Sequence, residues 1–195
     1  MTEQVGAVNM LLVIAVPVVL LVLLVLWFVV TYNRLVQQRN QVQAAGAQID
    51  VQLKRRHDLI PNLVETVRGY ATHERSTLDA VVAARQGAVA SVGAPRGQQA
   101  QAEGALTQTL GRLFALAEAY PDLKANQNFL ALQGELAGTE DKIAYSRQFF
   151  NSAVQTLNTS VQSLPSALVA GVGGFRTAEY FQADDEERGP VQVRF

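Results

Sequence analysis

Residues Met10–Val30, MLLVIAVPVVLLVLLVLWFVV, decide the fold because they form 21 consecutive positions without a charged side chain. A helix of this length is roughly 31 Å long, close to the thickness of a bilayer hydrocarbon core. Pro17 is tolerated in a membrane helix, and Trp27 and Tyr32 lie near the exit end, where interfacial aromatic rings are enriched. A soluble core helix would show a polar face, and this run has none. The sequence therefore predicts a transmembrane helix over residues 10–31.

A cleaved signal peptide is the alternative interpretation of this run, and the flanking residues argue against it. Residues 1–9, MTEQVGAVN, contain Glu3 but no lysine or arginine. The run exceeds a typical signal h-region, and no small-x-small cleavage site follows it. Because Arg34 and Arg39 follow the run, the positive-inside rule predicts a short extracytoplasmic N-terminus over residues 1–9 and a cytoplasmic C-terminal domain. The chain has no cysteine, which is consistent with a reducing compartment.

The composition after residue 31 favours an all-α fold. Ala, Gln, Leu and Val dominate, and no β-rich stretch is bounded by turn signals. The net charge of −1 gives no electrostatic reason to expect a nucleic-acid partner. We therefore expect one transmembrane helix followed by a long-helix, up-and-down bundle of the four-helix type over residues 32–182. Residues 183–195, which begin with an acidic run, are expected to be a disordered tail.

Apolar stripes with coiled-coil-like spacing predict the individual helices. The first helix is expected from Tyr32 to about Arg68, and its stripe continues in phase across Pro61, which favours a kink there over a reversal. Its stripe consists of Leu35, Val42, Ile49, Leu53, Arg56, Ile60, Leu63, Val67 and Tyr70. Arg56 is the one charged member of this stripe.

Turn signals divide the rest of the domain into further helices. Helices are expected at about 72–90, 98–119 and 126–163, with a turn at 91–97, an end at Pro121 and another at Leu164-Pro165. The apolar, glycine-rich segment 166–181 is expected to pack on the bundle. Four aromatic side chains at helical spacing are expected in the core, namely Tyr120, Phe129, Phe149 and Phe150.

The central block Ile49–Glu65, IDVQLKRRHDLIPNLVE, resembles the LemA family. Further matching segments are Tyr32-Asn33, Gly69-Tyr70-Ala71, Tyr120–Phe129, Gly174-Phe175 and Tyr180-Phe181. Gly46 departs from the family pattern, which usually has tryptophan there. The resemblance implies a single-pass membrane protein with a cytoplasmic helical bundle and no settled activity. It also implies an adaptor role, sometimes linked with membrane metalloproteases.

No catalytic, metal-binding or cofactor-binding residue is predicted. His73-Glu74 begins like the HExxH motif of metalloproteases, but Thr77 stands where the second histidine is needed. Gly171, Gly173 and Gly174 resemble a phosphate loop only in composition, because no GKS or GKT follows.

Charged and polar residues near Pro61 are the candidates for a partner or self-assembly contact. These residues are Lys54, Arg55, Arg56, Asp58, Asn62 and Glu65. Local pairing of Asp50 with Lys54, and of Lys54 with Asp58, is the plainer interpretation of the cluster. Asp58, Asn62 and Glu65 are similarly expected to satisfy backbone groups that the proline leaves without a partner.

The sequence thus favours a non-enzymatic scaffold or adaptor, anchored in the plasma membrane of a bacterium by residues 10–31. Its bundle is expected to bind itself or another membrane protein. One alternative is an accessory subunit of a membrane metalloprotease, which rests on the resemblance alone. The other is a homo-oligomeric, membrane-shaping structural protein.

Overall fold

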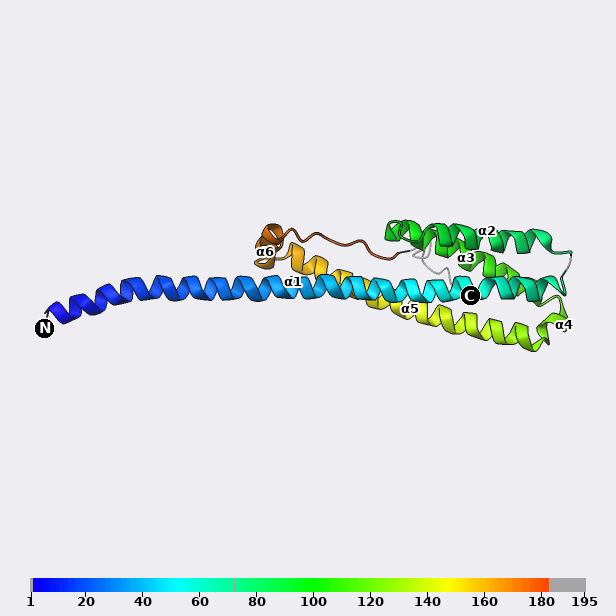
Figure 1. Ribbon diagram of the computed structural model, residues 1–195, viewed down its shortest axis with the longest axis horizontal. Helices are drawn as coiled ribbons and strands as arrows, with labels where there is room; N and C mark the ends of the chain where they lie inside the picture. The colour runs from blue at the N-terminus through cyan, green and yellow to red at the C-terminus, as the bar shows by residue number, and fades with distance from the viewer. Residues whose placement is uncertain (1, 72, 183–195) are drawn as a thin grey trace, which may run out of the picture. The chain divides into compact units, whose positions relative to one another are not determined.

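The computed structural model describes residues 2–71 and 73–182, and the side chains from residue 14 onward within those ranges. All regular structure in these residues is helical, which confirms the predicted all-α class (Figure 1). The helices are α1 (Thr2–Arg68), α2 (Arg75–Ala90), α3 (Arg96–Ala117), α4 (Pro121–Lys124), α5 (Gln127–Gln162) and α6 (Ser166–Gly173). The disorder predicted for residues 183–195 concerns residues outside the described ranges.

The chain divides into two compact units, to which both α1 and α5 contribute. The apolar-helix unit comprises residues up to 41 together with 155–178. The bundle unit comprises residues 42–154 and, among the described residues of the C-terminal segment, 179–182.

The bundle unit contains four long helical segments that alternate in direction, from α1 through α2 and α3 to α5 (Figure 1). Its core holds the apolar stripe predicted for α1, which is buried at every apolar position from Val42 to Val67. Each of the other helices adds leucine, valine or phenylalanine to that core, including Leu78, Val81, Leu106, Leu113, Phe129 and Leu136. The helical period of the apolar residues therefore identified the buried face of α1 correctly from Val42 to Val67.

Some details of the helices differ from the sequence-based prediction. α1 passes through Pro61 and ends at Arg68, so the chain does not reverse at the proline. Pro121 does not end a helix; it opens the short α4, because a proline at the first helical position has no hydrogen bond to lose. α2 begins at Arg75 rather than at residue 72. The expectation that Phe149 lies in the core is wrong, since its side chain is 42% exposed while the neighbouring Phe150 is buried.

The apolar-helix unit contains the long apolar run. Side chains from Ile14 to Val30 are exposed, apart from partly buried Phe28, and the apolar window of α1 has a mean hydropathy of 3.0 with none of it buried. Within the described residues, α1 is the single helix long and apolar enough to cross a membrane, a property shared by membrane anchors and signal sequences.

Contrary to the expectation, the segment after α5 does not pack on the bundle as a whole, because residues 155–178 belong to the apolar-helix unit. Proline at 165 precedes α6, and Gly174, with φ of 68°, ends it in the left-handed conformation that favours glycine. Within the apolar-helix unit, the ring of Phe175 lies edge-on to Tyr32 with centroids 5.4 Å apart. Within the bundle unit, Phe181 is buried, and its backbone exchanges two hydrogen bonds with the Asn151 side chain.

Candidate functional site

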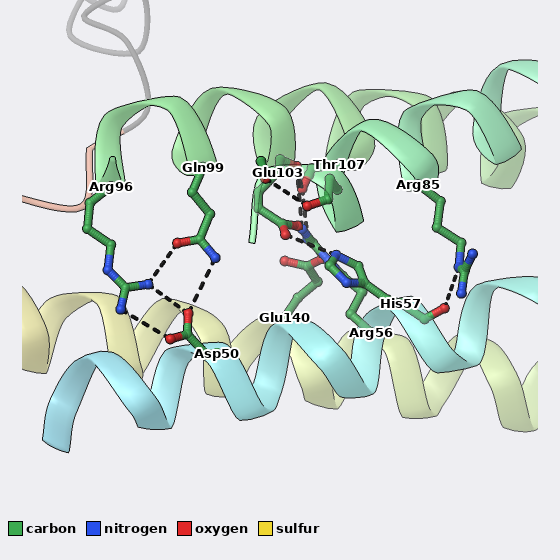
Figure 2. A network of polar contacts seen from close by, with 11 residues as sticks. Asp50, Arg56, His57, Arg85, Arg96, Gln99, Glu103, Thr107 and Glu140 are labelled. Atoms are coloured by element: carbon green, nitrogen blue, oxygen red, sulfur yellow. Dashed lines mark hydrogen bonds and ion pairs between the residues drawn. The ribbon is translucent and has the colours of Figure 1, made fainter. Parts of the chain in front are cut away.

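A charged network lies inside the bundle unit around Arg56, the charged member of the α1 stripe (Figure 2). The Arg56 side chain is fully buried, as is that of Glu103 on α3, and the two form an ion pair. Arg56 also pairs with Glu140 of α5, and its Nη1 donates to Thr107 Oγ1 at 3.0 Å. A buried charge is tolerated only when it is paired and hydrogen-bonded, so this network lets an arginine occupy a core position.

His57 completes the network from the next position of α1. Its Nε2 lies 2.9 Å from Glu103 Oε1, so the two carboxylate oxygens of Glu103 have different partners, His57 and Arg56. Burial by itself raises the pKa of the Glu103 carboxyl. The hydrogen bond with His57 and the positive charge of Arg56 outweigh that effect and hold the pKa below its ordinary value. Glu103 is therefore ionised at neutral pH.

Arg85 of α2 compensates for the hydrogen bond that Pro61 removes from α1. A proline has no backbone N–H, so the carbonyl four residues earlier, that of His57, has no helical donor. Arg85 Nε donates to this carbonyl oxygen at 2.7 Å (Figure 2). The prediction that a polar side chain bonds the backbone group left without a partner by the proline is thus confirmed. The donor, however, comes from another helix and is not Asp58, Asn62 or Glu65.

A second polar cluster links α1 to the start of α3. Arg96 Nη1 and Nη2 donate to the two carboxylate oxygens of Asp50 at 2.7 and 3.1 Å, and Gln99 accepts a further bond from Arg96 (Figure 2). The expected pairing of Asp50 with Lys54 is wrong, because a guanidinium fork offers Asp50 two parallel bonds that an ammonium cannot.

The six candidate contact residues have different environments. Lys54 pairs with Asp58 at 2.5 Å on the surface, as predicted, and this contact lowers the pKa of Asp58. Arg55 pairs with Glu135 of α5, also at 2.5 Å and largely exposed. Arg56 alone of the six is fully buried, so its charge is directed to Glu103 and Glu140 and not to the surface.

The remaining two candidates line a shallow hollow between α1 and α5. Asn62 and Glu65 lie there, and the hollow has a volume of about 490 Å³. Its other lining residues are Thr66, Asn128, Ala131, Leu132 and Glu135.

A larger groove of about 640 Å³ lies between α1, α2 and the start of α3. Three valines in it, Val51, Val89 and Val92, are exposed. Charged and polar side chains line it as well, namely Asp50, Lys54, His57, Asp58, Arg85 and Gln99, together with Leu53. The groove therefore combines exposed apolar surface with charges of both signs.

Comparison with known proteins places the chain in a family. A model of the LemA family matches residues 45–195, which is more than half of the chain. The chain belongs to the LemA family.

Its relatives are distant but cover most of its length. Magnetosome protein MamQ 2 of Paramagnetospirillum magneticum is 29% identical over 201 residues, which span 89% of this chain and 74% of the relative. Magnetosome protein MamQ of Magnetospirillum gryphiswaldense is 27% identical, over 92% of this chain and 75% of the relative. Protein LemA of Metamycoplasma hominis is 24% identical, over 83% and 73% respectively.

Gly46 lies close to two side chains of the bundle unit. A Cβ atom added there would lie 2.8 Å from Arg96 Nη2 and 3.5 Å from the ring of Phe150. The Arg96 guanidinium stacks over that ring, 5.6 Å from its centroid. The space beside Gly46 is therefore occupied by an arginine side chain stacked on an aromatic ring.

The sequence-based reasoning missed the members of the network on α2, α3 and α5, and those on α3 carried the clearest signal. Gln99 and Glu103 continue the stripe of Leu106, Leu110 and Leu113 backward at the same four- and three-residue steps. A buried ion pair can be detected in a sequence when one helix has a carboxylate at a stripe position and another helix has an arginine at one. The pattern does not show which helices meet, because stripe positions on all of them look alike.

His73 and Glu74, the HExxH-like pair, lie just before the start of α2. His73 is exposed, and Glu74 accepts a hydrogen bond from the Tyr120 hydroxyl at 3.1 Å, which raises the pKa of Tyr120. Within the part of the chain that the structure describes, no three His, Asp or Glu side chains are grouped as metal ligands would be.

Proposed function

We propose that this LemA-family protein is a membrane-anchored, non-enzymatic helical scaffold. Residues 10–31 span the plasma membrane with residues 1–9 outside, and the bundle unit binds a protein partner on the cytoplasmic side. The observation that carries the proposal is the groove with Val51, Val89 and Val92, because it leaves apolar surface exposed beside charged side chains. Such surfaces on a folded domain are typical of protein-binding sites.

The environment of the charged side chains supports a binding role over a catalytic one. Arg56 and Glu103 are fully buried and directed toward one another, and His57 is nearly so. A catalytic acid or base must reach its substrate within hydrogen-bond distance or through one water molecule. Arg56 and Glu103, enclosed in this way, stabilise the register of the helices and present no open face to a substrate.

The chemistry of the groove defines its proposed occupant, an amphipathic helix of another membrane-associated protein. The three exposed valines would receive apolar side chains at three- and four-residue spacing. Arg85 uses one of its five N–H donors on the His57 carbonyl, so its guanidinium retains donors for a carboxylate of the partner. The partner helix would therefore carry an acidic residue beside its apolar stripe.

Site-specific photo-crosslinking in intact membranes tests this function. A photoreactive amino acid is placed at Val51, Val89 or Val92 of the full chain, and at Tyr145 as the matched control, since Tyr145 is 70% exposed on α5. We expect one and the same protein to be crosslinked from all three groove positions and not from the control. Adding Val92→Glu to the Val51 probe should abolish the crosslink, because the groove then carries an uncompensated charge.

The identity of the crosslinked protein separates the alternatives. A membrane protease would make this chain an accessory subunit within the same binding role. Crosslinks exclusively between differently tagged copies of this chain would replace the adaptor by a homo-oligomeric structural protein. Crosslinking equal to that at Tyr145 would overturn the assignment of the groove as the binding site.

A further inference from the structure

α6 exposes an apolar ridge that the proposed scaffold function does not explain. Leu164 just before the helix, and Leu168 and Val172 within it, are 77%, 65% and 80% exposed. The three lie four residues apart, so Leu168 and Val172 share one helix face with Leu164 near its start. The sequence of α6, SALVAGVG, has no charged side chain.

Contacts within the apolar-helix unit fix α6 beside the end of the apolar run of α1. A Cβ atom added to Gly173 would lie 3.1 Å from the Tyr32 ring, so the end of α6 lies directly against that ring. Phe175, just after α6, packs edge-on against Tyr32 and lies under the Arg39 guanidinium, 5.4 Å from it.

The start of α6 lies beside the same part of α1. A pocket of about 320 Å³ has Pro165 and Ser166 on one side and residues of α1 on the other. Those residues of α1 are Trp27, Val30, Thr31, Arg34, Leu35 and Gln38. Both ends of α6 thus lie beside the segment where the apolar run gives way to polar sequence.

From this placement we infer that α6 is a membrane-interface helix, whose apolar ridge inserts at the boundary between lipid headgroups and acyl chains. The inference rests on the proposed anchoring of residues 10–31. If that run crosses the bilayer, Trp27 and Tyr32 lie at its surface, and α6 is held at the same depth. The exposed apolar surface of α1 then continues into the ridge of α6, and one phospholipid surface covers both.

The charges that follow the apolar run agree with an interfacial position of α6. Arg34 and Arg39 on α1 follow the apolar run directly, where their guanidinium groups can contact lipid phosphates. Interfacial helices bury one apolar face at the headgroup boundary. An inserted α6 would be a second attachment of the chain to the membrane, besides residues 10–31. This attachment would restrict the rotation of α1 about its own axis.

Measuring the depth of α6 in phospholipid vesicles tests the inference. Single cysteines can be introduced for labelling because the chain has no cysteine of its own. Spin labels are attached to Leu168→Cys and Val172→Cys in the full chain, reconstituted in vesicles of phosphatidylcholine and phosphatidylglycerol. Val22→Cys in the apolar run reports the anchor, and Asn40→Cys, on an exposed position of α1, serves as the aqueous control. Accessibility to oxygen, which concentrates in lipid, is compared with accessibility to a water-soluble nickel chelate.

We expect the labels at Leu168 and Val172 to favour oxygen over nickel, at a depth between those of Val22 and Asn40. If Val22 is in lipid but both α6 labels resemble Asn40, the interfacial assignment is overturned while the anchor stands. If Val22 itself is accessible to nickel, the proposed anchor fails as well. Labels on α6 shielded from both reagents would indicate a protein contact and would also overturn the inference.

Discussion

Along Ile14–Val30 of α1, leucine and valine side chains are exposed, whereas along Asp50–Val67 of the same helix an arginine and a histidine are buried. In the second segment the charges have partners from α3 and α5, and the apolar stripe packs on other helices. In the first segment no helix covers the apolar side chains of the window. The difference shows that the burial of a side chain follows from the helices packed around it and not from its own polarity.

Introducing aspartate into the buried stripe should have the largest effect. Ile60→Asp places an unpaired charge at a fully buried position and should cost several kcal/mol, about the total stability of a domain. We expect loss of the cooperative melting transition of the full chain in detergent, followed by circular dichroism. Leu136→Asp on α5 should behave in the same way. Val51→Asp on the exposed face of α1 is the control and should melt as the wild type does.

Removing Arg56 tests whether the buried charges depend on one another. Arg56→Leu leaves the Glu103 carboxylate buried without its main partner and should cost about 3–5 kcal/mol in the free energy of unfolding. The double variant Arg56→Leu, Glu103→Leu should lose less than the sum of the two single losses. Lys54→Ala, which breaks an exposed pair on the same helix, should change little. Additive losses in the double variant would mean that the ion pair is not the source of the effect.

The same aspartate substitution in the exposed segment should affect membrane insertion and not bundle folding. Leu23→Asp should disfavour insertion by about 2.5–3.5 kcal/mol, because a charge at the centre of a membrane helix must leave water. The fraction of the chain that remains in alkali-washed membranes measures this, with Leu23→Ala as the control. Melting of the bundle should be unchanged. Full retention of the Leu23→Asp variant in the washed membranes would contradict a spanning role for residues 10–31.

A coupled pair of substitutions tests the contact between α2 and the proline of α1. Arg85→Ala leaves the His57 carbonyl without a donor and should cost about 1–3 kcal/mol. In a Pro61→Ala background the new backbone N–H of residue 61 can bond that carbonyl, so the same Arg85→Ala change should cost less. Urea unfolding of the four variants gives the coupling free energy. Equal costs in both backgrounds would assign the contribution of Arg85 to another contact.

The smallest expected effect is a change in the acid slope of stability. The pKa of Glu103 is lower in the folded chain than its ordinary value of 4.5. Its ionised form therefore contributes stability above about pH 4.5, and this contribution is lost as the pH falls through the lower, folded pKa. The stability measured by urea unfolding between pH 7 and 3 should fall less steeply for Glu103→Gln than for the wild type. Parallel pH profiles of stability for the variant and the wild type would contradict the prediction. Residues 10–30 contain no side chain that titrates in this range, so the apolar run does not contribute to the slope.

The candidate contact residues were predictable as a cluster of charged and polar side chains, but their separate roles were not. Lys54 and Asp58 pair within one turn of a helix, so their spacing in the sequence was sufficient to predict the contact. Arg56 and Glu103 lie 47 residues apart, and their pairing requires the register of α1 against α3. The groove has the same origin, because its valines come from α1, from α2 and from the turn after α2.

The sequence by itself determined the helical class, the apolar run and the buried stripe of α1 from Val42 to Val67, because helical periodicity and the absence of charge are local properties. Only the tertiary structure decided which charges are paired inside, how the His57 carbonyl is satisfied, and that α6 lies beside Tyr32. These contacts join residues that are far apart in the chain. Their geometry depends on how side chains of different helices fill a shared space, which no single stretch of sequence specifies.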